Sequence, residues 1–280
     1  MADEPIISIS GMSFSYALAE RPALSGIDLE IRRGEYVAVM GLNGAGKTTL
    51  GLCLNGIIPH MLMGEQTGRV RVDGHDPAVR VVREMARTVG IVFDNPEFQM
   101  SQITAAEEVA LGLENLGVPS EEMPERIAAA LRLVGLDGFE ERSPMALSGG
   151  QQQRLAIAAV LVMRPSILFM DEPTSNLDPL GKDEIFEIAR RLNQEEGMTV
   201  IVAEHEVEVL AEYADRVVVM HEGRIVLQGP PSEVLSQVDV LTALGLRSPQ
   251  VTEFAHALSG ASTGLPVTTD ATLSWLEARA

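Results

Sequence analysis

Short apolar runs recur along the chain, and stretches with helical spacing separate them. Five of these runs are rich in aliphatic residues: residues 36–40, 88–93, 166–170, 199–203 and 216–220. Runs of this length without polar alternation are typical of strands that are buried on both faces of a sheet. Because helical patterns intervene between them, we predict an α/β fold with a mostly parallel sheet.

Polar and apolar residues alternate in two segments near the N-terminus, residues 7–16 and 23–31. Such alternation predicts strands that have one buried and one solvated face, and it favours antiparallel pairing. Residues 68–76 and 221–229 carry further strand-and-turn patterns. We therefore expect an antiparallel β-subdomain beside the parallel sheet.

The segment 95–163 has a different, helical character. Thr104 and Glu107 have the spacing of a capping box, and apolar residues such as Val109 and Leu113 follow at helical spacing. We interpret this segment as an α-helical subdomain inserted into the α/β core.

The inserted segment divides the predicted core into residues 1–94 and 164–231. After residue 231 the composition changes again, and short helical patterns are broken by "LRSPQ" and "SGASTGLP". Residues 232–280 are therefore predicted to form a small C-terminal helical unit.

Composition and charge narrow the range of functions. The chain of 280 residues has a formal net charge of −19 and is 46% hydrophobic, which supports a folded core and disfavours binding to nucleic acid or anionic lipid. The single cysteine, Cys53, excludes an internal disulfide framework.

The N-terminus lacks the pattern of a secretory signal, and no apolar run reaches the roughly 18 residues of a membrane span. We expect a soluble cytosolic chain.

A glycine-rich segment follows the apolar run 36–40. It reads "GLNGAGKTT" and matches the phosphate-binding motif G-x-x-x-x-G-K-[ST] in the strand-to-helix context that the motif requires. Backbone N–H groups would surround phosphate oxygens, Lys47 would reach the β- and γ-phosphates of ATP, and Thr48 would offer a hydroxyl to Mg²⁺. The predicted ATP-binding residues of this segment are Gly41, Asn43, Gly44, Gly46, Lys47, Thr48 and Thr49.

Acidic residues and a histidine follow two other predicted strands. Asp171 and Glu172 come directly after residues 166–170, and His205 follows residues 199–203 closely. In open α/β sheets ligands bind beyond the carboxyl ends of the strands. Taken alone, Asp171 and Glu172 would suit a solvated turn, and His205 would suit an ordinary surface position. Beside the Lys47 motif, Asp171 is predicted to hold Mg²⁺, Glu172 to polarise the attacking water, and His205 to sense the γ-phosphate.

A second glycine-containing stretch, "LSGGQQQR", begins at Leu147. Ser148 and Gln151 satisfy a capping box, so a well-capped helix explains these two residues. It does not explain Gly149 and Gly150, because glycine in a first turn lowers helix stability. Adjacent glycines at that position suit a backbone that must approach an anion closely.

Together with "SILFMDEPTSNLD" and His205, this stretch resembles the signature, Walker B, D-loop and switch histidine of ABC-type ATPases. The resemblance implies a P-loop NTPase core and two subunits packed head to tail, so that the signature residues contact ATP held by the other subunit. The residues assigned by this resemblance are the signature residues Ser148, Gly149, Gly150 and Gln151, the D-loop residues Ser175 and Asp178, and Tyr16, which would stack on adenine. The alternative for Tyr16 is an ordinary strand aromatic.

One residue departs from the family pattern. Asp94 stands at the end of the run 88–93, where ABC-type ATPases usually have Gln. An ionised Asp can approach Mg²⁺ through water, but it cannot donate a hydrogen bond as an amide does. The departure bears on coupling and rate rather than on nucleotide binding.

Further stretches narrow the resemblance: "FDNPEFQ", "AAEEVALGLENLGVP", "LCLNGIIPH" and "LGLRSPQVTEFAHAL" resemble ATPase subunits of energy-coupling-factor (ECF) transporters. This implies uptake of a vitamin or a transition-metal ion, a multi-span transmembrane coupling subunit, and a substrate-binding membrane subunit. It also implies that residues 232–280 help to hold an ATPase pair together, and that the chain lies peripherally on the cytoplasmic side of the cell membrane. The sequence leaves open which substrate is carried and whether the pair is a homodimer or a heterodimer.

Two alternatives belong to other functional classes. One is a soluble ABC ATPase that acts in DNA repair or translation, although the long insertions typical of such proteins are lacking and the acidic charge disfavours polyanions. The other is a regulatory scaffold that binds ATP without useful hydrolysis, a reading supported only by Asp94.

Overall fold

A computed structural model describes residues 4–279 of the chain. Its largest element is a six-stranded sheet with the order β5-β6-β7-β3-β8-β9. All neighbours pair in parallel except β8 and β9, which form an antiparallel hairpin at one edge. The strands are β5 (Val89–Val92), β6 (Ile167–Asp171), β7 (Thr199–Ala203), β3 (Tyr36–Met40), β8 (Arg216–His221) and β9 (Arg224–Gly229).

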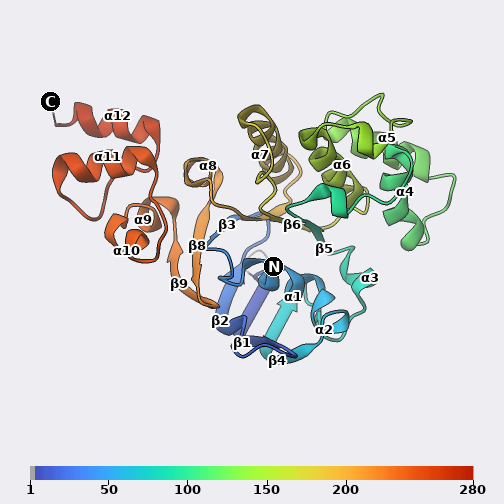
Figure 1. Cartoon of the computed structure of the whole chain (residues 1–280), viewed down its shortest axis with the longest axis horizontal. Coiled ribbons are helices and arrows are strands. Elements are labelled where there is room, and N and C mark those ends of the chain that lie inside the picture. The colour runs from blue at the N-terminus through green and yellow to red at the C-terminus, as the bar shows by residue number, and fades with distance from the viewer. Residues whose placement is uncertain (1–3, 280) are drawn as a thin grey trace.

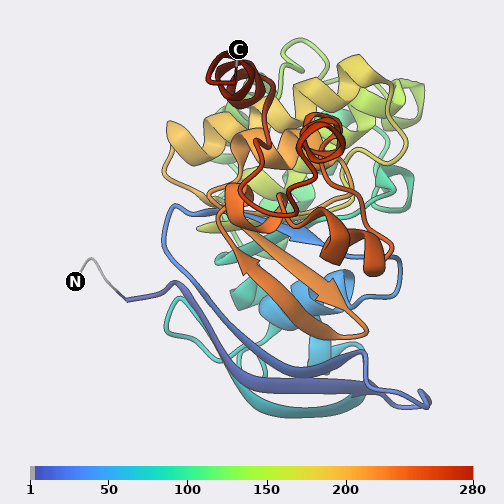
Figure 2. The same cartoon turned by 90° about the vertical axis from the view of Figure 1, so that its left-hand side faces the viewer.

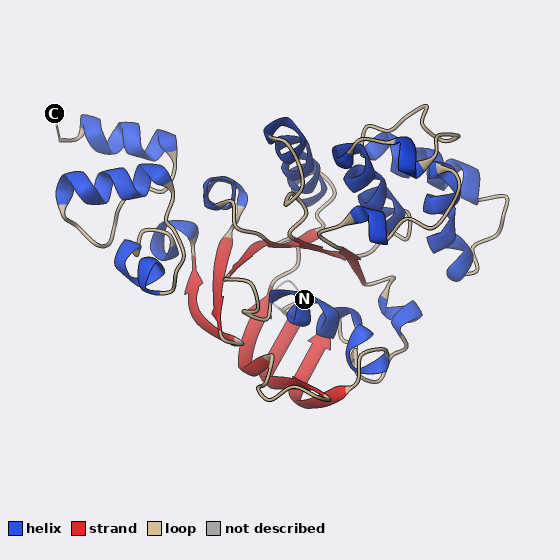
Figure 3. Cartoon of the chain, viewed as in Figure 1, coloured by secondary structure: helices blue, strands red, loops and turns tan. Residues whose placement is uncertain are grey.

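A second, three-stranded sheet is entirely antiparallel and has the order β2-β1-β4. Its strands are β1 (Ile7–Tyr16), β2 (Leu24–Ile31) and β4 (Gly64–Val72). Helix α1 (Lys47–Asn55) lies between the two sheets, and the short α2 (Ile57–His60) follows it (Figure 3). The mostly parallel sheet and the antiparallel subdomain predicted from hydrophobic patterning are both confirmed.

The helices of the segment 95–163 lie on the face of the six-stranded sheet that is opposite α1 and the three-stranded sheet (Figure 1). The capping box of Thr104 and Glu107 is present at the start of α4, and the capping box of Ser148 and Gln151 is present at the start of α6. A short α3 (Val82–Met85) precedes β5. The remaining elements of this segment are η1 (Pro96–Phe98), α4 (Ala105–Asn115), α5 (Met123–Leu133), η2 (Pro144–Ala146) and α6 (Gly149–Leu161).

Two apolar clusters cover the two faces of the six-stranded sheet. One face packs on α1 and the three-stranded sheet, and the other packs on α4, α5, α6 and α7 (Pro179–Gln194). The packing is tight at two glycines. A Cβ on Gly51 of α1 would lie 2.5 Å from the Phe169 ring of β6, and one on Gly90 of β5 would lie 2.2 Å from Val160 Cγ1 of α6.

The C-terminal helices lie beyond the β8–β9 edge (Figure 2). A third apolar cluster joins the beginning of this unit to β8 and to α8 (Val207–Tyr213). The unit contains α9 (Pro231–Val234), α10 (Val238–Ala243), α11 (Gln250–Ser259) and α12 (Thr269–Glu277). Between residues 4 and 279, the structure holds no helix with the length and apolar character of a membrane span.

Candidate functional site

The loop between β3 and α1 holds a lysine in a buried position. Gly46 caps α1 with φ 105°, and a Cβ there would lie 2.7 Å from Ala23 O, so only glycine fits. The Lys47 side chain is 4% exposed, and its Nζ donates a hydrogen bond to Gly41 O at 2.8 Å. The loop therefore positions a cation directly at the N-terminus of a helix, which is an anion-binding arrangement.

A cleft of about 470 Å³ opens over this loop. It gathers residues from β1, the loop, α1 and the carboxyl ends of β5 and β6. Of the residues predicted to bind ATP or Mg²⁺, those that line the cleft are Tyr16, Asn43, Gly44, Gly46, Lys47, Thr48, Thr49, Asp94, Asp171 and Glu172. Gly41 lies at the start of the loop and lines a neighbouring pocket with His205.

Asp171 ends β6 at the floor of this cleft. It is 6% exposed, and its Oδ1 has no hydrogen-bond partner in the described structure. Burial raises the pKa of Asp171 above its ordinary value, with smaller contributions from Glu172 and then Asp94, whereas a hydrogen bond with Thr48 and the charge of Lys47 act to lower it. An unpartnered buried carboxylate oxygen beside a threonine hydroxyl is a donor set that suits Mg²⁺.

The protein side chains alone do not complete a metal site. Among residues 4–279 no group of three or more His, Cys, Asp or Glu side chains is arranged to hold a metal ion. Because Mg²⁺ takes six oxygen ligands, its remaining ligands would be phosphate oxygens and water. The site thus fits a metal that arrives with a nucleotide rather than a resident metal.

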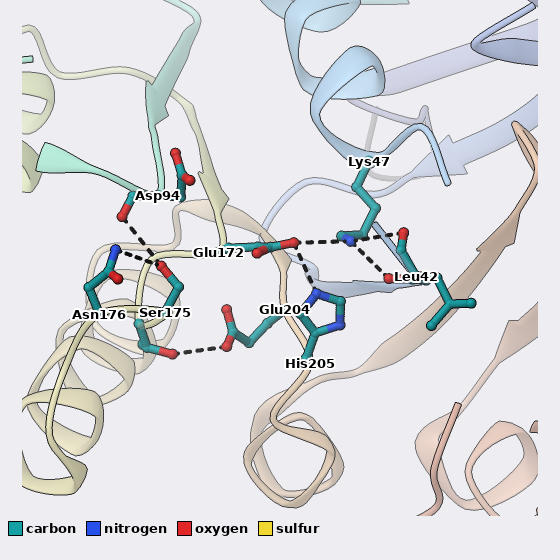
Figure 4. A network of polar contacts seen from close by, with 10 residues as sticks. Leu42, Lys47, Asp94, Glu172, Ser175, Asn176, Glu204 and His205 are labelled. Carbon is teal, nitrogen blue, oxygen red and sulfur yellow. Dashed lines mark hydrogen bonds and ion pairs between the residues drawn. The ribbon is translucent and has the colours of Figure 1, made fainter. Parts of the chain in front are cut away.

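Glu172 connects two other functional side chains (Figure 4). Its Oε1 lies 3.1 Å from Lys47 Nζ and 3.0 Å from His205 Nε2. Burial acts to raise the pKa of Glu172, but Lys47 and then His205 outweigh it, so the pKa lies below its usual value. Glu172 also has φ 47°, a left-handed conformation that costs energy in a non-glycine residue and often marks a functional site.

Tyr16 lies at one side of the cleft. Its hydroxyl is 3.1 Å from Thr49 Oγ1, and its ring meets the Phe14 ring edge-on with centroids 4.9 Å apart. These contacts tie the ring to both α1 and β1. A flat aromatic surface is therefore held beside the phosphate-binding loop, as adenine stacking would require.

The signature residues lie apart from the cleft, because none of Ser148, Gly149, Gly150 and Gln151 lines it. Ser148 Oγ accepts from the Gln151 backbone N–H at 3.3 Å, so the predicted cap accounts for these two residues. A Cβ on Gly149 would come no closer than 3.7 Å to another atom, and one on Gly150 no closer than 3.9 Å. Packing within the chain therefore does not require either glycine.

The predicted D-loop has a structural role at its end. Asp178 Oδ1 accepts from Gly181 N at 2.7 Å and caps α7. Ser175 Oγ approaches Asp94 O at 3.5 Å, which places the start of the D-loop beside the end of β5. Asp178 is thus explained by the helix cap.

Sequence reasoning missed a buried pair next to Glu172 and His205. Thr174 Oγ1 donates to Glu204 Oε1 at 2.9 Å, and both side chains are fully buried or nearly so. Burial raises the pKa of Glu204 to about 7, and nearby acids add to the effect. The available signal was an acidic residue directly after the apolar run 199–203 and directly before His205.

The combination of a lysine loop, an Asp–Glu pair at the end of β6 and a capped helix bearing two adjacent glycines can be compared with known proteins. A family model described as "ABC transporter" matches residues 24–175. The chain belongs to this family. It is an ABC-type ATPase, with the P-loop NTPase-like fold of an ABC cassette.

Two relatives of known sequence are similar over nearly their whole length. A putative ABC transporter ATP-binding protein of Pyrococcus abyssi is 46% identical over 253 residues, which cover 90% of each chain. The energy-coupling factor transporter ATP-binding protein EcfA1 of Symbiobacterium thermophilum is 44% identical over 272 residues, which cover 94% of this chain and 93% of that protein.

Solved structures agree with these sequence matches. The cbiO1 protein from Clostridium perfringens, described as part of the ABC transporter complex cbiONQ, has a TM-score of 0.75 and 35% identity, covering 90% of this chain and 99% of that one. The ATP-binding cassette MJ0796, in a dimeric post-hydrolysis state bound to ADP and Pi, has a TM-score of 0.70 and 28% identity, covering 80% of this chain and 98% of that one. This ABC cassette is thus similar to ATP-binding subunits of transporters, among them ECF-type ATPases.

Proposed function

We propose that this ABC ATPase energises a membrane importer of the ECF type, through an ATP-driven head-to-tail dimer. The likeness to EcfA1 and to cbiO1, a part of the cbiONQ complex, supports this type. The partners would be a second ABC ATPase subunit, a multi-span transmembrane coupling subunit and a substrate-binding membrane subunit. The substrate would be a vitamin or a transition-metal ion, and the chain would act peripherally at the cytoplasmic side of the membrane.

The observation that carries the proposal is the cluster of Lys47, Glu172 and His205. Glu172 Oε1 lies 3.1 Å from Lys47 Nζ and 3.0 Å from His205 Nε2. Lys47 would turn from Glu172 to the β- and γ-phosphates, and the freed carboxylate would take a proton from the attacking water. His205, which already contacts Glu172, would keep that carboxylate in place and bond the γ-phosphate.

The residues present fit ATP and Mg²⁺ as cofactors. Thr48 and Asp171 would hold Mg²⁺, with Asp94 approaching through water, and the ion would neutralise charge on the phosphates. Tyr16 would stack on adenine, while the backbone N–H groups from residues 43–49 would bind the phosphates. Asp94 lies at the same cleft as Asp171, which supports a place near the metal in spite of its unusual identity.

The two open glycines support a site that is shared between chains. Gly149 and Gly150 meet nothing within this chain that excludes a side chain, so a contact outside the chain is needed to explain them. In a head-to-tail dimer, Ser148, Gly149, Gly150 and Gln151 would contact the γ-phosphate bound by the partner's lysine loop, and the segment from Ser175 to Asp178 would cross the interface.

The predicted domain division suits this mechanism. Residues 1–94 and 164–231 would bind and hydrolyse ATP, residues 95–163 would present the signature helix, and residues 232–280 would help to hold the pair. Exposed apolar side chains on α11 and α12 support the last role: Phe254 is 53% exposed, Leu258 60% and Leu273 57%. Two copies of this chain would contain every part of the composite site.

The test of hydrolysis is Mg²⁺-dependent turnover by the purified chain and by Glu172→Gln. We expect the variant to keep ATP affinity, to lose at least about 100-fold in turnover, and to accumulate as a dimer in size-exclusion chromatography with ATP. Turnover near the wild-type value would rule out Glu172 as the base. No turnover by the wild-type chain and its membrane partners would instead favour a regulatory scaffold.

Co-purification tests the importer. From detergent-solubilised membranes of the source cell, the tagged chain should bring down a multi-span protein and a small membrane protein, identified by mass spectrometry. Recovery of soluble partners alone, with ATPase activity retained, would favour an ABC ATPase that is not coupled to transport.

A further inference from the structure

Glu204 is a buried carboxyl that the proposed hydrolysis does not use. It follows the last residue of β7, directly precedes His205 and is 3% exposed. Its Oε1 accepts from Thr174 Oγ1, but its Oε2 has no hydrogen-bond partner in the part of the chain that the structure describes. Burial of an incompletely hydrogen-bonded carboxyl lowers the stability of the fold. A contribution to stability alone therefore does not explain the presence of Glu204 at this position.

The position of Glu204 joins three segments that build the site. Its backbone N–H donates to Val39 O at 3.2 Å, which ties it to β3 just before the lysine loop. Its side chain bonds Thr174, two residues after Glu172 in the turn that leads into Ser175. Figure 4 shows this contact beside the pair formed by Glu172 and His205.

We propose that Glu204 is a positioning residue for ATP hydrolysis, and that its bond to Thr174 fixes the strand delivering His205 against the turn delivering Glu172. The inference rests on the proposed function. Because Ser175 follows Thr174 and begins the proposed D-loop, the same bond also links His205 to the segment that would contact the second subunit.

The surroundings of Glu204 favour a neutral carboxyl for this task. Burial raises its pKa to about 7, with smaller contributions from the charges of Glu172 and Glu206 and against the lowering effects of the Thr174 bond and the His205 backbone N–H. The pKa of the Tyr36 hydroxyl on β3 is raised above its usual value first by burial, and then by the charges of Tyr213 and Glu204. Ionisation of Glu204 would place an unbalanced negative charge near Glu172.

The test uses the full chain with its transporter partners and measures kcat and KM for ATP hydrolysis. Removal of the bond by Glu204→Ala or by Thr174→Val should lower kcat about tenfold and change KM for ATP less than about twofold. The double variant should be no slower than the slower single variant, because both remove one interaction. Glu204→Gln, which keeps an oxygen acceptor, should retain most of the activity.

A matched control lies on the same strand. Thr199 is fully buried at the other end of β7, where its Oγ1 accepts from Gly34 N at 2.9 Å. Thr199→Val removes a hydrogen bond of β7 away from the site and should leave kcat near wild type.

A pH profile adds a second readout, because wild-type kcat should fall relative to that of Glu204→Gln as pH rises through about 7.

Wild-type kcat in folded Thr174→Val, or a loss in Glu204→Gln as large as in Glu204→Ala, would overturn the inference. If Glu204→Ala does not fold, Thr174→Val and Glu204→Gln decide. Failure of the proposed function looks different: the wild-type chain would not hydrolyse ATP, or Glu172→Gln would turn over normally.

Discussion

Lys47 has three oxygen partners among the described residues: Gly41 O, Leu42 O and Glu172 Oε1. At the residue scale, these partners satisfy a buried ammonium that would otherwise be costly. Lys47, together with His205, outweighs the effect of burial and holds the pKa of Glu172 below its usual value, so this carboxyl is ionised. A phosphate bound at this loop would take over part of the bonding of the Lys47 ammonium.

Glu204 gives a prediction at the same scale, because its pKa of about 7 lies above the value of 4.5 expected in an unfolded chain. A carboxyl with a raised pKa supports folding below its unfolded pKa, and this support is lost as pH rises through the folded pKa. Relative to wild type, Glu204→Gln should therefore gain about 2 to 3 kcal/mol in free energy of unfolding between about pH 5 and about pH 8. Denaturant titrations at the two pH values measure it.

The control for this prediction is again Thr199→Val. Its free energy of unfolding should differ from that of wild type by the same amount at both pH values, since no titrating group is changed. A constant difference for Glu204→Gln as well would show that Glu204 does not titrate in the folded chain over this range.

At the element scale, the N-terminus of α6 carries the residues that we propose to meet the second subunit. Ser148 and Gln151 close its capping box, while Gly149 and Gly150 lower its helical propensity without a packing reason. Gln153, 1% exposed, donates from Nε2 to Phe93 O at 3.3 Å and ties this helix to the residue before Asp94. The helix is therefore linked to the cleft, although its N-terminus is remote from it.

Gly149→Ala should separate stability from activity. Because its Cβ would lie 3.7 Å from the nearest atom, the variant should gain up to about 1 kcal/mol in free energy of unfolding from helix propensity. Its Mg²⁺-dependent ATP turnover should nevertheless fall sharply, since the side chain would enter the shared phosphate site.

Gly90→Ala is the opposite control, because its Cβ would lie 2.2 Å from Val160 Cγ1 and should destabilise the fold. Normal turnover in a stabilised Gly149→Ala variant would contradict the assignment of the signature.

The strands were predictable because each buried strand is a continuous apolar run, and the phosphate loop because its residues are contiguous. Strand β4 is an exception: it begins at Gly64, before the predicted 68, since residues 64–67 lie on an edge strand and show no apolar alternation. The bond between Thr174 and Glu204 was not predictable, because parallel pairing of β6 and β7 brings together residues 30 positions apart.

At the scale of the whole molecule, the central claim is that one chain carries two half-sites that meet only in a pair. The cleft holds Lys47, Asp171 and Glu172, and the signature residues do not line it. A single chain thus contains a phosphate cradle and, apart from it, an open helix N-terminus. The proposed pair of chains would bring the two together and would account for both.

Site-directed cross-linking tests this claim most directly. Asn43→Cys and Gln151→Cys would be made separately in Glu172→Gln chains, mixed, and oxidised with and without ATP and Mg²⁺. The only native cysteine, Cys53, is 1% exposed and does not compete. We expect a disulfide-linked dimer that requires ATP and forms only between the two different variants. Cross-linking within each variant alone, or none in the ATP-bound mixture, would contradict the head-to-tail arrangement.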